Sequence, residues 1–219
     1  MMYNFDEIIK DMDFHNKRVF DMVSNFDKII RHMDFPDEDV FYFLQIIKRR
    51  KENPDMLKNE IQLQAYHITS IDQLERLEDE ITDFCDYHNA RAYFHLNKRS
   101  FKRIGLETLK IIADYVANEE YKSIKKAFNS ACGKFSSDPI KKWILDVDFF
   151  PQNMSLMSHL DKFLREIEPI GEDKIIDIIK TKNGLHIITK PFNLKAFKEI
   201  LPQIEVHKNN PTLLYSPPK

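Results

Sequence analysis

The chain has few glycines and few cysteines, and these shortages exclude several kinds of site. Only 4 of its 219 residues are glycine, and neither the Walker nor the Rossmann phosphate-loop pattern occurs. The two cysteines, Cys85 and Cys132, form no CxxC pair and no Cys/His ligand spacing. Neither a disulfide framework nor a structural zinc site is therefore expected, and a reducing cytoplasm is the default environment.

Long apolar runs and an excess of one charge are also missing. No run approaches the length of a membrane span, and the acidic N-terminus Met1–Glu7 lacks the order of a secretory signal. A total of 33 Lys and Arg against 35 Asp and Glu gives a formal charge of -2, so contact with nucleic acid must depend on local patches. A soluble protein without a membrane partner is expected, and its 42% hydrophobic content suffices for a packed core.

The first quarter of the chain has a helical pattern. Apolar residues recur at three- and four-residue spacing across residues 5–52, which predicts a helical N-terminal region over 1–57. Its last helix ends in the basic run Lys48–Lys51, which suits a helix C-terminus or, alternatively, contact with phosphate. The turn Asn53–Asp55 predicts a boundary.

Beyond this boundary the pattern changes to alternating strands and helices. Strands are predicted at Glu60–Ile68 and Ala90–Leu96, each followed by an amphipathic helical stretch, so that an αβ module spans 58–140. A compact basic group follows the second strand, at the start of the next predicted helix, and is a candidate for phosphate contact. Its members are Asn97, Lys98, Arg99, Ser100, Lys102 and Arg103.

The most informative stretch is the apolar run Trp143–Phe150, which is interrupted by Asp146 and Asp148. Side chains of a strand alternate between faces, so the two carboxylates are expected on the same face. Two adjacent anions repel one another and favour a cation between them, and Mg²⁺ or Mn²⁺ prefers such oxygen ligands. Alternatively the pair is solvated, or Lys141 and Lys142 neutralise it.

Residues 143–207 read as strand, helix, two strands, helix and strand. The tight turn Lys182–Gly184 between two apolar runs is a strong hairpin signal. The order β-α-β-β-α-β is the ferredoxin-like arrangement found in RNA-recognition modules and polymerase palms, which predicts an α+β fold. Its first and third strands are neighbours, so His186 is expected on the same sheet face as Asp146 and Asp148.

These motifs resemble the archaeo-eukaryotic primase superfamily, the primase-polymerases, in the small form found in phages and mobile elements. Asp146–Asp148 after an apolar run resembles the hhDhD signature, and Thr181–His186 resembles the sGxH-like turn and strand. The segment Ala90–Ser100 is similar to the N-terminal αβ module of that family. The resemblance covers about Glu60 to Tyr215 and implies a catalytic core over 58–219, with an RRM-like palm at 141–219.

The resemblance implies roles for individual residues. Asp146 and Asp148 match the metal-binding, catalytic positions, and His186 matches the position that contacts the phosphates of the incoming nucleotide. A third metal-binding acid is expected on a later strand, with Glu205 as the candidate and Asp177 as the alternative. The remaining candidates for nucleotide binding are Lys182, Arg99 and Asn183, the last of which stands where the family has serine.

The implied activity is that of a DNA primase- or polymerase-like nucleotidyltransferase in the cytoplasm of a phage-infected or bacterial host cell. It would use NTP or dNTP on a DNA template, with Mg²⁺ or Mn²⁺, by two-metal phosphoryl transfer. Three alternatives stay open. The chain is an inactive descendant, a non-catalytic module that binds nucleic acid or protein, or a metal-dependent nuclease.

Overall fold

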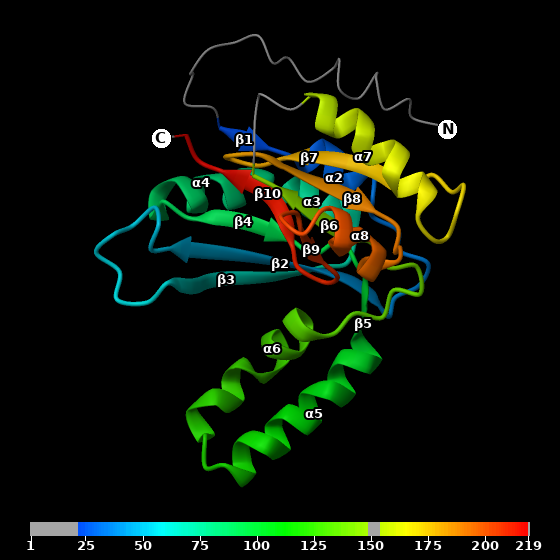
Figure 1. Ribbon diagram of the computed structural model, residues 1–219. Helices are drawn as coiled ribbons and strands as arrows, with labels where there is room; N and C mark the ends of the chain where they lie inside the picture. Colours follow the sequence, from blue (N-terminus) through cyan, green and yellow to red (C-terminus); the bar gives the residue numbers. More distant parts are fainter. Residues whose placement is uncertain (1–21, 149–153, 219) are drawn as a thin grey trace.

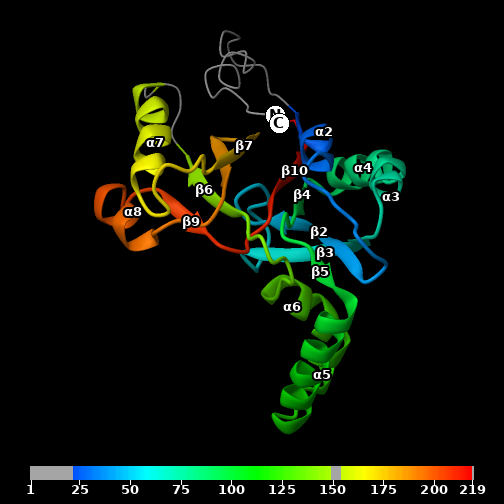
Figure 2. The ribbon, with the colours of Figure 1, turned by 90° about the vertical axis from the view of Figure 1, so that its right-hand side faces the viewer.

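The structure is a computed structural model that describes residues 22–148 and 154–218. It is a mixed α+β fold in which helices pack against two antiparallel sheets (Figure 1). Figure 2 shows the second sheet and its helices to one side of the first sheet, with the helices α5 and α6 projecting away from both. In the described part of the chain, no helix is long and apolar enough to cross a membrane.

The first sheet combines strands from distant parts of the chain. Its order is β1-β10-β4-β2-β3, and the short strand β5 pairs with β2. The strands are β1 (Val23–Ser24), β2 (Val40–Arg49), β3 (Glu60–Ile68), β4 (Arg91–Phe94), β5 (Arg99–Ser100) and β10 (Thr212–Ser216). Strand β10 lies between β1 and β4, so residues late in the sequence complete the middle of this sheet.

The second sheet has the order β7-β8-β6-β9, and all of its pairs are antiparallel. Its strands are β6 (Trp143–Val147), β7 (Ile175–Lys180), β8 (Leu185–Thr189) and β9 (Glu205–His207). Along the chain, a helix follows β6 and another follows β8. These strands agree with the strands expected between residues 143 and 207.

Helices cover the sheets in three groups. Near the first sheet are α2 (Phe26–Ile30), α3 (Ile71–Arg76) and α4 (Glu78–His88), whose apolar residues share one core with that sheet. The projecting hairpin consists of α5 (Phe101–Ala117), the 3₁₀-helix η1 (Tyr121–Lys126) and α6 (Ala127–Lys134). The second sheet is covered by α7 (Met154–Glu166) and α8 (Leu194–Ile200).

The helix predicted to end at Lys48–Lys51 is wrong, because Val40–Arg49 is the strand β2. This strand is buried on both faces. Phe41 and Phe43 contact the core beneath α5 and α6, whereas Leu44 packs on the other side, into the core shared with α2 to α4. A strand covered on both faces shows a continuous apolar run without alternation, and such a run also fits a helical spacing template.

Other boundaries also differ from the sequence analysis. The turn expected as a domain boundary lies in the loop that joins β2 to β3, two strands of one sheet. Residues 212–216, which were assigned to the palm at 141–219 without a predicted strand, form β10 in the first sheet. Of the predicted N-terminal helices, residues 1–21 lie outside the described residues, and α2 forms at Phe26–Ile30.

An apolar core joins the two sheets. Ile144, Ile179 and Ile188 of the second sheet belong to the same buried cluster as residues of β2, β4 and β10. Burial of each such side chain contributes about 1.5–3 kcal/mol. The opposite face of the second sheet packs under α7 and α8 through residues such as Leu145 and Val147. The second sheet therefore has two buried faces, and only part of one face is open.

Candidate active site

Asp146 lies on β6, an inner strand of the second sheet, and is paired with one residue on each neighbouring strand. On β8 its register partner is His186, and on β9 it is Glu205. Directly paired residues of antiparallel strands project from the same face. The strand register therefore brings Asp146, His186 and Glu205 together on one sheet face, where Asp146 and His186 were expected from the sequence.

A second histidine joins this group. His207 follows Glu205 by two residues on β9, and its Nε2 atom lies 3.9 Å from Oδ2 of Asp146 and 3.5 Å from Oε2 of Glu205. From the other side, Nε2 of His186 lies 3.6 Å from Oδ1 of Asp146. His207 was not among the predicted site residues, although the two-residue repeat of a strand places it on the same face as Glu205.

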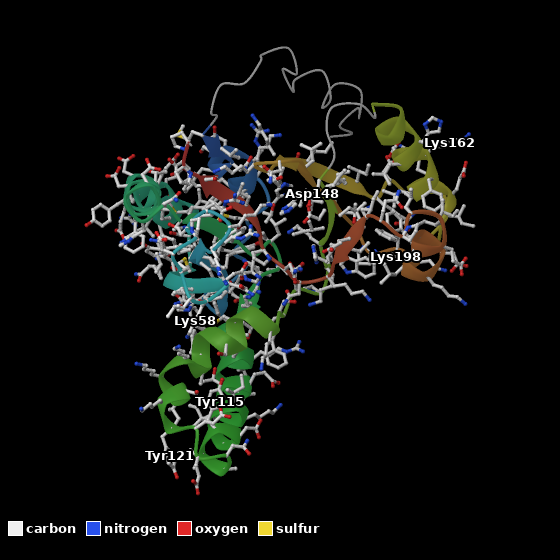
Figure 3. The ribbon with its side chains drawn as sticks, turned by 60° about the vertical axis from the view of Figure 1, so that its left-hand side comes forward. Lys58, Tyr115, Tyr121, Asp148, Lys162 and Lys198 are labelled. Carbon is white, nitrogen blue, oxygen red and sulfur yellow. The ribbon has the colours of Figure 1, made fainter. Side chains whose placement is uncertain are left out.

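Asp148 follows the last residue of β6 and is exposed. It lines the same cleft as Asp146, in the space between the two sheets (Figure 3). Burial raises the pKa of Asp146 above its ordinary value, and the nearby carboxylate of Asp148 raises it further. A concentration of negative charge thus lies at the end of this strand, where a bound cation would be stabilised.

Gly184 has no room for a side chain. A Cβ atom at this position would lie 2.0 Å from the carbonyl oxygen of Val147 and 2.9 Å from the Cα of Asp148. The turn is closed by a hydrogen bond from the amide of Thr181 to the carbonyl of Gly184, 2.9 Å long. The hairpin turn predicted from the sequence therefore packs directly on the backbone that carries Asp148, and only glycine permits this approach.

His186 is held from the first sheet. Its Nδ1 atom is 2.9 Å from Oγ1 of Thr212, a buried residue at the start of β10. Burial lowers the pKa of His186 to about 4, with a further contribution from His207, so the ring is neutral at pH 7. An ionised Asp146 favours the tautomer with the proton on Nε2, and the Thr212 hydroxyl then donates to Nδ1.

These residues line a cleft of about 670 Å³ between the two sheets. The wall from the second sheet carries Asp146, Asp148, Lys182, Asn183, His186, Glu205 and His207, and the opposite wall carries Gln45, Ile47, Arg49, Lys51, Glu60, Arg91, Tyr93 and His95. The cleft thus places carboxylates and imidazoles opposite cationic side chains. Six of the seven predicted site residues lie in it.

The cations of the opposite wall are held by specific contacts. Nη1 of Arg49 donates to the Tyr93 hydroxyl at 3.1 Å, and Nη2 of Arg91 donates to Oε1 of Glu52 at 2.6 Å. Arg91 and Glu52 are both largely buried, and the Nε atom of Arg91 has no hydrogen-bond partner among the described residues. Fixed guanidinium groups facing carboxylates across an open cleft are suited to binding a phosphorylated ligand together with a metal ion.

The cleft contains the type of ligand atom that a hard divalent cation prefers. Asp146, Asp148 and Glu205 supply carboxylate oxygens, and Mg²⁺ commonly takes one or two carboxylates together with substrate phosphates. Within residues 22–148 and 154–218, no three or more His, Cys, Asp or Glu side chains form a group already arranged to hold a metal.

Arg99 is the predicted site residue that the structure does not bring to the cleft. Its side chain is fully buried, and its guanidinium donates to the carbonyl of Cys132 at 2.9 Å, to the carbonyl of Asn97 and to Nδ1 of His95 at 2.9 Å. Burial lowers its pKa to about 10. The prediction that Arg99 contacts a nucleotide is wrong, because all of its nitrogens face protein atoms.

Three other members of the basic group, Asn97, Lys98 and Ser100, also make structural contacts, whereas Lys102 and Arg103 are exposed at the start of α5. Asn97 is buried and donates to the carbonyl of Lys142, Lys98 pairs with Asp34 at 2.8 Å, and the Ser100 hydroxyl caps α5 by accepting from the amide of Arg103. These contacts fix the segment between β4 and α5 to Lys142, which precedes β6, and to Asp34, which follows α2. Amino-acid composition alone could not distinguish residues with these structural roles from residues of a phosphate-binding site.

Two alternatives from the sequence analysis are excluded. Asp177 lies on β7 and its Oδ2 is 2.9 Å from Nε2 of His32, so it does not reach the cleft. Lys141 and Lys142 do not neutralise the Asp146 and Asp148 pair, since their ammonium groups donate to Ser136 and to the carbonyls of His32 and Leu96.

Comparison with protein-family models, with curated proteins and with solved structures finds no match for the chain. The function is therefore inferred from the residues of the cleft.

Proposed function

We propose that the protein is a primase-polymerase-like nucleotidyltransferase that transfers nucleotides from NTP or dNTP to a nucleic-acid strand. The observation that carries this proposal is the register of Asp146 with His186 and Glu205 on a cleft whose other wall holds Arg49 and Arg91. Carboxylates for a metal and cations for phosphates, facing one another, are the parts that phosphoryl transfer requires.

The second sheet is proposed to be a ferredoxin-like, RRM-like palm. Support comes from the element order β6-α7-β7-β8-α8-β9 and from the sheet order β7-β8-β6-β9. In this order the first strand of the unit lies between its third and fourth strands, as in the ferredoxin-like arrangement. It is this order that gives Asp146 a neighbour on each side.

Each residue of the cleft has a distinct task in this proposal. Asp146 and Asp148, with Glu205, would hold Mg²⁺ or Mn²⁺. Such ions activate a 3′-hydroxyl and neutralise charge on the departing pyrophosphate when they are bound. His186 would donate its Nε2 proton to a phosphate oxygen, while Thr212 fixes the ring from behind.

The cations complete the phosphate site. Lys182 and Asn183 lie in the turn beside Asp148, and Arg49 approaches from the opposite wall. Arginine binds phosphate in a planar, bidentate manner, whereas lysine contributes a mobile point charge. Together they would orient the triphosphate so that the bond to be broken lies next to the carboxylates.

The test is calorimetry with Mn²⁺ and an NTP, followed by incorporation assays on primed and unprimed templates. We expect NTP binding that requires the metal, and Asp148→Asn should weaken this binding and reduce incorporation by at least about 100-fold, since developing charge would go unneutralised. Asp114→Asn is the matched control, because Asp114 is exposed on α5, outside the cleft.

Each alternative gives a different result in the same assays. If no NTP binds while a single strand still binds without metal, the protein is a binding module and the transferase proposal is wrong. If the strand is degraded in the absence of NTP, the protein is a nuclease that uses these carboxylates. Equal metal affinity in the native protein and in Asp148→Asn would contradict the proposed metal site.

A further inference from the structure

The basic run Lys48–Lys51 lies at the open end of a long hairpin. Strand β2 ends at Arg49, and residues 50–59 connect it to β3. The neighbouring strand β4 pairs with β2 only between Leu44 and Ile47, so the hairpin end reaches beyond it (Figure 1). We refer to residues 48–60 as the basic hairpin.

Several cations of the basic hairpin are not neutralised. Arg50, Lys51 and Lys58 are exposed, and within the described residues none of their side chains takes part in an ion pair. Of the three carboxylates here, Glu52 is engaged by Arg91, Glu60 pairs with Arg49 at 3.5 Å, and Asp55 is exposed in the connecting loop. Free cations clustered on an exposed hairpin attract a polyanion.

The basic hairpin is continuous with the cleft. Arg49 and Lys51 line the cleft opposite the carboxylates, and they also line a shallow depression outside it together with Arg50 and Asn59. Between Gln45 and Arg49 the wall extends about 13 Å, and the cations continue past it. Stacked nucleotides advance about 3.4 Å per step, so this track accommodates about four of them. A mononucleotide in the cleft would not reach Arg50 and Lys58, which do not line it.

We infer that single-stranded nucleic acid binds along the basic hairpin, with backbone phosphates on Arg50, Lys51 and Lys58 and one end of the bound segment in the cleft. This inference deepens the proposed function, on which it rests, by assigning the surface that binds the nucleic-acid partner. Contacts to phosphates fix the position of a strand without reading its sequence. Binding should therefore be strongly dependent on salt and nearly independent of base composition.

The experiment measures the anisotropy of a fluorescein-labelled oligo(dT) in EDTA, without nucleotide, from about 50 to 200 mM KCl. The variant is Arg50→Gln/Lys51→Gln/Lys58→Gln. The matched control is Lys122→Gln/Lys125→Gln/Lys126→Gln, which removes three exposed cations from η1, near Tyr121 at the far end of the helical hairpin (Figure 3). Circular dichroism and thermal melting establish that both variants are folded.

We expect the hairpin variant to bind at least about 10-fold more weakly at low salt. Each lost phosphate contact lowers the slope of log K against log salt by about 0.7, so the slope should fall by about 2. The control should retain the native slope. An unchanged slope in the hairpin variant, or an equal loss in the control, would overturn the inference.

The strand-binding experiment can fail or succeed independently of the test of the proposed function. Strand binding is measured without metal or nucleotide, whereas the transferase proposal is tested by metal-dependent NTP binding. If NTP does not bind but strand affinity depends on Arg50, Lys51 and Lys58, the hairpin inference stands without the transferase. If NTP binds with metal but the affinity for the single strand does not depend on these three residues, only the hairpin inference fails.

Discussion

At the scale of single residues, the site depends on strand parity. Asp146, His186 and Glu205 could be grouped from the sequence because a strand repeats every two residues and the expected topology set the neighbours. The cations of the opposite wall could not be found in this way. Arg49 and Arg91 come from β2 and β4 of the other sheet, and no local pattern relates them to Asp146.

Gly184 offers the sharpest test at this scale. In Gly184→Ala, the added methyl group would collide with the Val147 carbonyl, so the turn or the Asp148 backbone must move. We expect a loss of about 3 kcal/mol in the free energy of unfolding, measured by urea denaturation.

The control for this substitution is Gly105→Ala. A Cβ at Gly105, inside the helix α5, would meet nothing within 4 Å. Alanine is favoured over glycine inside a helix, so a gain of about 0.5–1 kcal/mol is expected there. Equal effects at the two positions would contradict the close packing of the turn on β6.

At the scale of elements, six of the ten described strands were predicted from the sequence, whereas β2 was assigned to a helix, and β10 and the two-residue strands β1 and β5 were not predicted. Neither β2 nor β10 shows the alternation of apolar and polar residues that is typical of a half-exposed strand. All five residues of β10 are buried, and its apolar run is short. Strands that are covered on both faces lose the polar half of the pattern, and only the tertiary structure separates them from buried helix.

The stability of the junction of β4, β5 and α6 is expected to depend on pH through His95. His95 is buried, and burial, followed by the charge of Arg99, holds the pKa of His95 well below its ordinary value. The unfolded chain, where histidine titrates near pH 6.5, therefore binds the proton more readily. Stability is retained above about pH 6.5 and falls as the pH is lowered from there.

We expect His95→Gln to reduce this loss of stability on acidification. The free energy of unfolding, measured in urea between about pH 6.5 and 5, should change less steeply than in the native protein, by up to about 1.4 kcal/mol per pH unit. An identical slope would mean that His95 is not buried in its neutral form.

At the scale of the whole molecule, the two sheets share one core and are expected to unfold together. Ile188 of β8 is fully buried in the cluster that contains residues of β2, β4 and β10. Ile188→Ala should lower the free energy of unfolding by about 2–5 kcal/mol. Exposed Ile200 serves as the control, and Ile200→Ala should change it by less than about 0.5 kcal/mol.

Two probes distinguish joint from separate unfolding. Trp143, the single tryptophan of the chain, reports on the second sheet, and far-ultraviolet circular dichroism reports on the whole fold. The two transitions should coincide in the native protein and in Ile188→Ala. Two separated transitions would mean that the sheets are independent folding units.

The position of β10 has a consequence for synthesis of the chain. This strand fills the gap between β1 and β4, and it follows every other strand in the sequence. On the ribosome, the earlier strands emerge first, so the facing edges of β1 and β4 stay open until residues 212–216 leave the exit tunnel. Thr212, which holds His186, arrives in the same segment. The cleft is therefore completed only after residues 212–216 have emerged, and until then a nascent chain carries the carboxylates of β6 without the complete cleft around them.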